Sequence, residues 1–295
     1  MLLLHMVDEL LIISAGSGRN LKRIILPGDS FRQIRWQGFM KTLFLAWGLH
    51  RSDVSIGNGC AHWFPIGRLD GESERSWFRF AYTRGALAAQ AEVGFQPLAA
   101  FPRFDRVYEF EALFPLFRNR VISPMREDYA EYLDRLCLSA DQADPFHILA
   151  ISGGGKQTDN LEVFPELQTR LDGTFLCRFF LHGWDHLNVM SQDRLQHLEP
   201  DEPLHISVEL NHPATGPTVR LHTTDDSLML GWAPRYLAHC VARSVSSGLG
   251  HFQARVVQLN QPPSPRSQRV LVELEGAFPA GYEPMKSQEF CYLHC

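Results

Sequence analysis

The alternation of hydrophobic and polar positions between residues 41 and 104 predicts three strands followed by one helix. Turn-forming segments separate the strands, at Gly57-Asn58-Gly59 and at Asp70-Gly71-Glu72-Ser73. After the third strand, residues 83–92 have helical spacing, and Gly94 stands where such a helix would end. Three strands joined by turns indicate a small antiparallel sheet or partial barrel. The predicted strands are 42–47, 63–69 and 77–82.

From residue 105 to about residue 159 the pattern changes to helical spacing. We expect one helix over residues 109–117, a second over 129–136 and a third over 146–151, which starts at Asp144-Pro145. The three glycines that follow residue 152 predict the end of the third helix. This part of the chain is therefore expected to connect two β-rich regions.

The last third of the chain returns to strand-like patterns. One short strand stops at Gly231, and Pro234 restarts the chain as an amphipathic helix, because proline at a first helical position costs no hydrogen bond. Leu237, Cys240 and Val241 recur at helical spacing and predict one buried face. The expected strands are 174–182, 204–210, 218–223, 228–231, 252–259 and 269–275.

These patterns predict an α+β protein built from five successive segments. A small antiparallel β domain and a C-terminal β-barrel with one or two helices are joined by a helical middle segment. No internal repeat or low-complexity tract interrupts them. The segments are an N-terminal extension at 1–40, the β-rich domain at 41–104, the helical connecting region at 105–165, the barrel at 166–285 and a C-terminal tail at 286–295.

Composition narrows the classes of partner. The chain has 295 residues, is 45% hydrophobic and carries a net charge of −5, which argues against a broad basic face that coats duplex DNA but not against a small pocket for one strand end. Asp8 and Glu9 interrupt the N-terminal apolar run, so we expect no signal peptide, no membrane segment and a cytoplasmic location. The scattered cysteines predict reduced thiols, at Cys60, Cys137, Cys177, Cys240, Cys291 and Cys295.

The glycine-rich run from Ser152 to Thr158 resembles a phosphate-binding loop only superficially. A phosphate loop needs a glycine five residues before its Gly-Lys pair and a hydroxyl residue directly after it, and these places hold Ala150 and Gln157. A helix C-terminus followed by a loop explains the run better. Because no nucleophile or acid–base arrangement stands out elsewhere, we expect a protein that is not an enzyme.

Two groups of histidines and cysteines invite a metal-site hypothesis. His182 and His186 are four residues apart, but Gly183 argues against a helix that would bring them together. The terminal Cys291, His294 and Cys295 match no standard zinc spacing. We therefore expect neither a metal nor another cofactor.

Two places in the last third combine a guanidinium with an aromatic ring. Arg235 and Tyr236 are expected at the lip where strand meets helix, facing away from the apolar stripe. In the strand over 174–182, Arg178 and Phe180 share one face, so that one face packs and the other presents a cation beside an aromatic ring. That pairing suits a stacked base and its phosphate, although a solvated arginine on a strand is the commoner case.

Four segments of the last third follow one another in a recognisable order. They are Arg178-Phe179-Phe180-Leu181-His182-Gly183, Glu209-Leu210-Asn211-His212-Pro213, Val219-Arg220-Leu221 and Leu230-Gly231-Trp232-Ala233-Pro234-Arg235-Tyr236. This order resembles the HIRAN domain, an OB-like β-barrel of certain DNA-repair translocases and of stand-alone bacterial proteins. The family has an aromatic-rich strand ending in glycine, a stretch like REPxNPYDxNAI and a corner like GYxPR. The stand-alone group also resembles this chain upstream, at residues 63–69, 80–85, 114–120 and 158–165.

The resemblance implies recognition of DNA, in better-understood members single-stranded DNA with a free 3′-hydroxyl end. Arg178 and Phe179 match the strand that grips the terminal nucleotides. Where the family has tyrosine and aspartate, however, this chain has Ala214-Thr215. An aspartate there would accept a hydrogen bond from the 3′-hydroxyl and the tyrosine would stack on the last base.

The sequence therefore predicts a non-enzymatic protein whose HIRAN-like barrel binds single-stranded DNA or DNA ends, with a role in DNA repair or phage defence implied by analogy. An alternative is a protein-interaction subunit of a larger nucleic-acid-processing or defence complex that has lost 3′-end recognition. A nuclease of unfamiliar type is a third possibility without a supporting motif. The expected contact residues are Arg178, Phe179, Arg220, Arg235 and Tyr236.

Overall fold

The protein is represented by a computed structural model that describes residues 4–7, 10–13, 41–48, 63–72, 76–156, 158–212, 216–246 and 251–293. It has two compact units, Met1–Phe39 and Met40–Cys295. In the first unit, β1 (Leu4–Val7) pairs antiparallel with β2 (Leu10–Ile13). The turn expected at 57–59, the residues Cys60, His294 and Cys295, and the Ala214-Thr215 pair lie outside the described residues.

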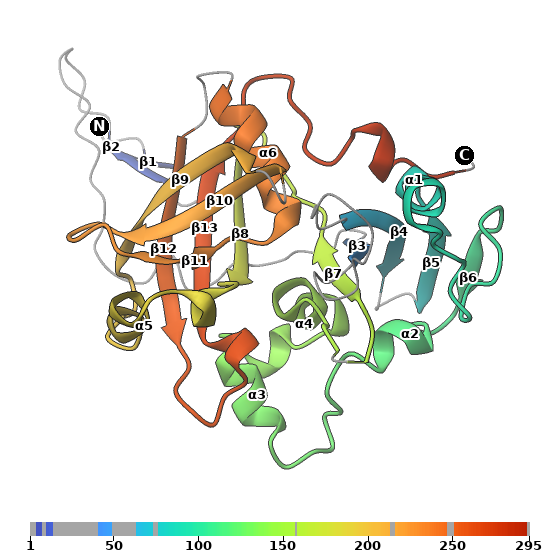
Figure 1. Ribbon diagram of the computed structural model, residues 1–295, viewed down its shortest axis with the longest axis horizontal. Helices are drawn as coiled ribbons and strands as arrows, with labels where there is room; N and C mark the ends of the chain where they lie inside the picture. The colour runs from blue at the N-terminus through green and yellow to red at the C-terminus, as the bar shows by residue number, and fades with distance from the viewer. Residues whose placement is uncertain are drawn as a thin grey trace. The chain divides into compact units, whose positions relative to one another are not determined.

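The second unit contains two antiparallel sheets (Figure 1). The first has five strands in the order β6-β5-β4-β3-β7. Helix α1 (Arg84–Val93) packs on β4 and ends at Gly94, as the sequence predicts. The strands of this first sheet are β3 (Lys41–Gly48), β4 (Trp63–Glu72), β5 (Trp77–Tyr82), β6 (Tyr108–Phe110) and β7 (Leu161–Pro165).

The second sheet is curled and has six strands in the order β11-β10-β9-β12-β13-β8 (Figure 1). The mixed α+β class with two antiparallel sheets is thus confirmed. All six strands overlap the ranges predicted from the sequence. They are β8 (Thr174–Phe180), β9 (Pro203–His212), β10 (Gly216–Thr223), β11 (Met229–Trp232), β12 (His251–Leu259) and β13 (Val270–Ala277).

Helices are short and serve mainly to cover the sheets. Asp144 caps α4 by accepting hydrogen bonds from the backbone amides of Phe146 and His147, and Gly153 ends that helix, as expected for the glycine-rich run. Helix α4 contacts both β7 and β8. The α-helices are α2 (Pro115–Arg118), α3 (Tyr129–Arg135), α4 (Pro145–Ser152), α5 (Val189–Leu195) and α6 (Arg235–Ser246); 3₁₀ turns occupy Ala140–Gln142, Trp184–His186, Arg266–Gln268 and Gln288–Phe290.

Three sequence predictions about elements need correction. The helix expected over 109–117 is replaced by β6 and by the single turn α2, because Phe110 and Tyr108 pair with β5. Residues 161–165, assigned to the helical region, form β7 beside β3 in the first sheet. Helix α5 was not predicted, since Val189 and Met190 are exposed and give it no buried stripe in the first turn.

An aromatic cluster joins the two sheets. Phe44 on β3 and Phe164 on β7 belong to the same buried cluster as the core of the curled sheet. The ring of Phe164 stacks on that of Tyr236 in α6, with ring centroids 4.8 Å apart and planes 10° apart. Stacked buried rings add about 1 kcal/mol beyond the burial of their area. Part of the first sheet therefore packs into the core of the curled sheet, while the first sheet also has a separate buried cluster that includes Phe80 and Phe117.

Residues 278–293 cross from the curled sheet to the first sheet. Phe290 packs edge-on against Phe44, with ring centroids 5.1 Å apart. The hydroxyl of Tyr292 donates to the buried carboxylate of Asp70 on β4, and the backbone amide of Leu293 donates to the carbonyl of Tyr82. This segment fastens the end of the second sheet to the first.

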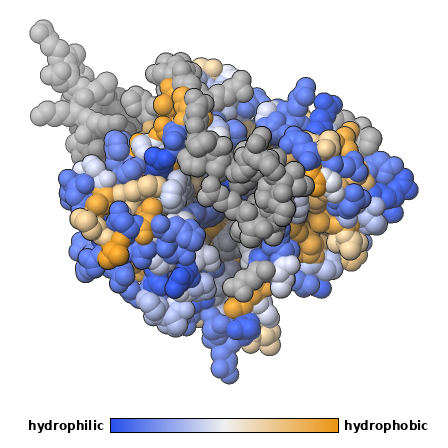
Figure 2. Space-filling model, viewed as in Figure 1, coloured by the Kyte–Doolittle hydropathy of each residue, from blue (hydrophilic) through white to orange (hydrophobic). Residues whose placement is uncertain are grey.

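On the face shown in Figure 2, hydrophobic residues form small groups among hydrophilic ones. Within the described residues, no helix has the length and hydrophobicity needed to cross a membrane. None of the described cysteines is part of a disulfide; they are Cys137, Cys177, Cys240 and Cys291.

Candidate nucleic-acid interface

The two strongest motifs of the last third meet where the edges of the curled sheet approach each other. His182, which follows β8, forms an antiparallel bridge with Trp232 at the end of β11. The two residues exchange backbone hydrogen bonds, with N···O distances of 2.9 and 3.0 Å. Strands β8 and β11 are the two outermost strands of the six, so this bridge joins the edges of the sheet. We call this place the seam.

Two glycines allow the seam to form. Gly231 has φ +148°, and a Cβ there would lie 2.6 Å from the carbonyl oxygen of His182. Gly183 has φ +67°, and a Cβ there would lie 2.7 Å from the indole of Trp232. The glycines of both motifs therefore let the backbone segments on either side of the seam lie close together, and they need not contact a ligand.

The seam places a cation, an aromatic ring and a histidine in one row. Arg220 on β10 lies directly opposite Trp232 on β11, and Trp232 lies opposite His182. Directly opposed residues of an antiparallel pair share a face of the sheet. His182 is exposed and Trp232 is half-buried. A partly exposed indole between a guanidinium and an imidazole can stack on a base while its neighbours approach phosphate.

The guanidinium of Arg220 already has an acidic partner, which a phosphate would have to replace. Its guanidinium forms an ion pair with Glu209 on β9, and both side chains are about one-third exposed, at 32% and 34%. Partly exposed pairs of this kind contribute only about 0–1 kcal/mol. A phosphate can therefore displace Glu209 at small cost.

Arg178 lies on β8, four residues before His182, but in a different environment. Its Nε donates to Oε2 of Glu273 over 2.8 Å, while Oε1 of that carboxylate accepts from Arg255 over 2.9 Å. The Glu273 side chain is only 4% exposed and that of Arg178 16%. The expected aromatic partner, Phe180, is buried beneath α3 and α4. The prediction that this face presents a cation beside an aromatic ring is therefore corrected.

Two of the expected contact residues belong to the core. Phe179 is 2% exposed and packs with the other inward-facing residues of the curled sheet. Tyr236 was expected to face away from the apolar stripe, but it is 4% exposed and stacks on Phe164. Burial, with Cys177 and Glu162 adding to it, raises the pKa of Tyr236 well above its usual value. Arg235, the first residue of α6, is half-buried.

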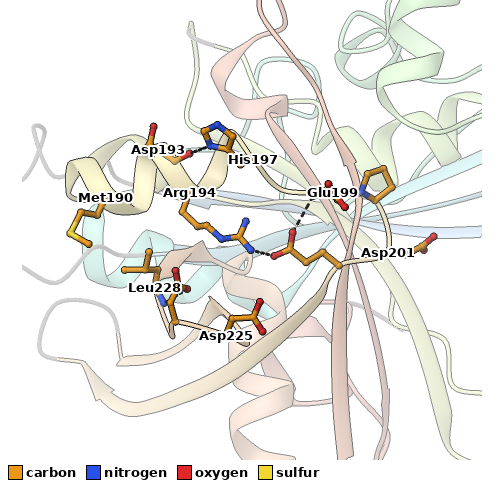
Figure 3. A pocket seen from close by; sticks show the side chains of 11 residues that line it. Met190, Asp193, Arg194, His197, Glu199, Asp201, Asp225 and Leu228 are labelled. Carbon is orange, nitrogen blue, oxygen red and sulfur yellow. Dashed lines mark hydrogen bonds and ion pairs between the residues drawn. The ribbon is translucent and has the colours of Figure 1, made fainter.

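A cavity beside α5 has the wrong charge for binding a nucleic acid. This cavity of about 750 Å³ lies between α5, the loop before β9 and the β10–β11 turn, and six of its eleven lining residues are Asp or Glu (Figure 3). Two of its lining residues, Arg194 and Glu202, form an ion pair, and Asp193, Glu199 and Asp225 add further carboxylates to the lining. Because these carboxylates repel phosphate, the cavity is a poorer site for a nucleic acid than the seam.

Other candidate chemistry is not assembled in the described part of the chain. No group of three or more His, Cys, Asp or Glu side chains within it converges on a metal-sized site. His186 lies in the turn after β8, and its nearest acidic partner is Asp185, 3.9 Å away. The seam thus remains the best candidate site among the described residues.

Sequence reasoning missed the two central residues of the seam, His182 and Trp232. The signal was present, since alternation from Arg178 puts His182 on the same face and Trp232 stands directly after the marker glycine of the corner. Comparison with protein-family models, with curated proteins and with solved structures finds no match to this chain.

Proposed function

We propose that this protein binds single-stranded DNA, including strand ends, through the seam of a HIRAN-like barrel, and that it is not itself an enzyme. The observation that carries the proposal is the row Arg220, Trp232 and His182, which puts a ring between two groups able to meet phosphate. The meeting of the strand motif and the corner motif at one bridge supports the same proposal. A place in DNA repair or phage defence rests on the resemblance alone.

The alternative function is a protein-interaction subunit that has lost 3′-end recognition. It is favoured by the neutralisation of Arg178 and Arg220 by Glu273 and Glu209, and by the net charge of −5. It is also favoured by the replacement of the family's tyrosine-aspartate pair by Ala214-Thr215. Under this alternative the same seam would contact a protein partner.

Fluorescence anisotropy with labelled single strands separates the two functions. We expect binding that Trp232→Ala weakens about tenfold or more, because one stacked base is worth about 1–3 kcal/mol. Trp77→Ala, which removes a half-buried indole from β5 of the other sheet, is the matched control and should leave the affinity unchanged. Strands ending in a 3′-hydroxyl and in a 3′-phosphate test end recognition.

Two results would overturn the proposal. Absence of binding below ~100 µM at moderate salt, about the weak limit of ordinary non-specific association, would leave the protein-interaction function. Metal-dependent cleavage of the strands would contradict both functions and require a catalytic site.

A further inference from the structure

A second cavity lies where the two sheets of the second unit meet. It has a volume of about 400 Å³ and is lined by residues of β4, β9, β10, α6 and the segment that crosses to the first sheet. That volume lies at the small end of the range for small-molecule pockets. Its lining includes four aromatic residues, Trp63, Tyr236, Tyr282 and Phe290.

Packing holds the rings of Tyr236 and Trp63 in place without a ligand. Phe164 stacks flat against Tyr236 at 4.8 Å and also contacts Trp63 at 5.3 Å between ring centroids. The indole N–H of Trp63 donates to Glu162 over 3.1 Å, which holds the ring in one orientation. Rings held in this way lose little entropy on binding a flat ligand.

The Tyr236 hydroxyl supplies a polar group that the fold itself does not use. The side chain is 4% exposed, yet its hydroxyl hydrogen-bonds to nothing in the described part of the chain. The hydroxyl is not among the fully buried polar atoms that lack a partner, which fits a group that reaches the cavity beside it. A ligand acceptor placed in the cavity would supply that partner.

The remaining polar groups define what else the ligand carries. Glu289 is exposed, lines the cavity, and is held by a 2.7 Å hydrogen bond from the Ser287 hydroxyl. Its carboxylate can accept from an amino group of the ligand. Among the described residues that line the cavity none is lysine or arginine; the basic side chain there is the exposed His239, and the Glu289 carboxylate repels a phosphate.

We infer that this cavity binds a flat, uncharged heteroaromatic ring bearing both an acceptor and an amino group, as in the base of adenosine or cytidine. The Tyr236 hydroxyl donates to a ring nitrogen or carbonyl, and Glu289 accepts from the exocyclic amine. Any phosphates stay outside. This inference rests on the proposed function where the base belongs to a bound strand, but the cavity chemistry is equally that of a free nucleoside.

Isothermal titration of the full chain with adenosine, and with ribose as the matched ligand without a base, tests the inference. We expect adenosine to bind and ribose not to. Tyr236→Phe keeps the stacked ring and removes only the hydroxyl, so it should weaken adenosine about three- to tenfold. Leu210→Trp changes a 47% exposed residue of the lining, and its larger side chain should abolish binding without disturbing the core.

Tyr132→Phe is the control, because Tyr132 is a buried tyrosine in the cluster around α3 and not in the cavity. Adenosine affinity that is absent, or unchanged by both Tyr236→Phe and Leu210→Trp, would overturn the inference. If single strands bind but adenosine neither binds nor competes, the cavity inference fails while strand binding at the seam stands. If adenosine binds in a Leu210-dependent way and strands do not, the inference stands and the proposed function fails.

Discussion

Arg178 and Arg220 come from the same kind of sequence pattern, a cation on an alternating strand, but the fold gives them different surroundings. Arg178 is 16% exposed and shares the buried carboxylate of Glu273 with Arg255. Arg220 is 32% exposed and pairs with a carboxylate that is itself one-third exposed. One guanidinium is part of the structure of the sheet, and the other can exchange its partner.

The difference shows that solvent access decides whether an arginine on a strand is available to a ligand. Moving a guanidinium away from the Glu273 carboxylate would leave a charge uncompensated in a nearly dry site, which costs several kcal/mol. Moving Arg220 from Glu209 to a phosphate replaces one partly solvated partner by another. Three experiments can break or sharpen this contrast.

The largest effect is expected at Glu273. Glu273→Gln leaves Arg178 and Arg255 without their shared negative charge, and we expect the free energy of unfolding to fall by about 3–5 kcal/mol in urea denaturation. Glu275→Gln, two residues along β13 and exposed, is the control and should change it by less than about 0.5 kcal/mol. Equally small effects of both substitutions would mean that the ion pair of Arg178 contributes as little to stability as the ion pair of Arg220.

A smaller effect should separate the two arginines by two measurements. We expect Arg178→Ala to lower the free energy of unfolding by about 2 kcal/mol, the range for a charged hydrogen bond, and Arg220→Ala by less than about 1 kcal/mol. Strand affinity should respond in the opposite order, with Arg220→Ala reducing the salt slope of binding by about 1. A folded Arg178→Ala variant with the larger loss of affinity would reverse the assignment.

The smallest effect concerns His222, which lies two residues from Arg220 on the same strand. Burial lowers its pKa below the usual 6.5, with His205 and Arg220 acting in the same direction. The folded state therefore binds a proton less readily than the unfolded state, so the stability contribution is present above pH 6.5 and is lost as the pH falls through the lowered pKa.

Thermal melts at several pH values compare the wild type with His222→Gln. We expect the variant to lose less stability on acidification, and Arg220→Ala to raise the pKa of His222 in an NMR titration. His186→Gln, which changes an exposed histidine of the turn after β8, is the control. An identical pH dependence in wild type and His222→Gln would show that other groups control it.

Much of the fold follows from local pattern. The strands over 63–72, 77–82 and 174–180 alternate or are bounded by turns, and each was predicted within a few residues. Strand β7 was not predicted, because Leu161–Pro165 becomes a strand by pairing with β3, which lies more than 100 residues earlier in the chain. Non-local pairing leaves no signature within a short window of sequence.

Less of the candidate site could be predicted. Of the expected contact residues, Arg220 keeps a partly exposed side chain, whereas Phe179 and Tyr236 are buried. The prediction for Tyr236 assumed one buried face on α6, whereas Phe164 from the first sheet covers a second face. Which faces of a helix are covered depends on a neighbour that its own sequence does not describe.

The crossing segment at 278–293 has a consequence for the order in which the protein folds during synthesis. The first sheet contains strands made early, but Asp70 receives its Tyr292 partner and Tyr82 its Leu293 amide only from residues made at the end. Contacts over more than 200 residues form slowly, because the chain between them must first be ordered. We therefore expect the first sheet to leave the ribosome as an unfinished intermediate, whose exposed aromatic edge invites chaperone binding until residues 290–293 arrive.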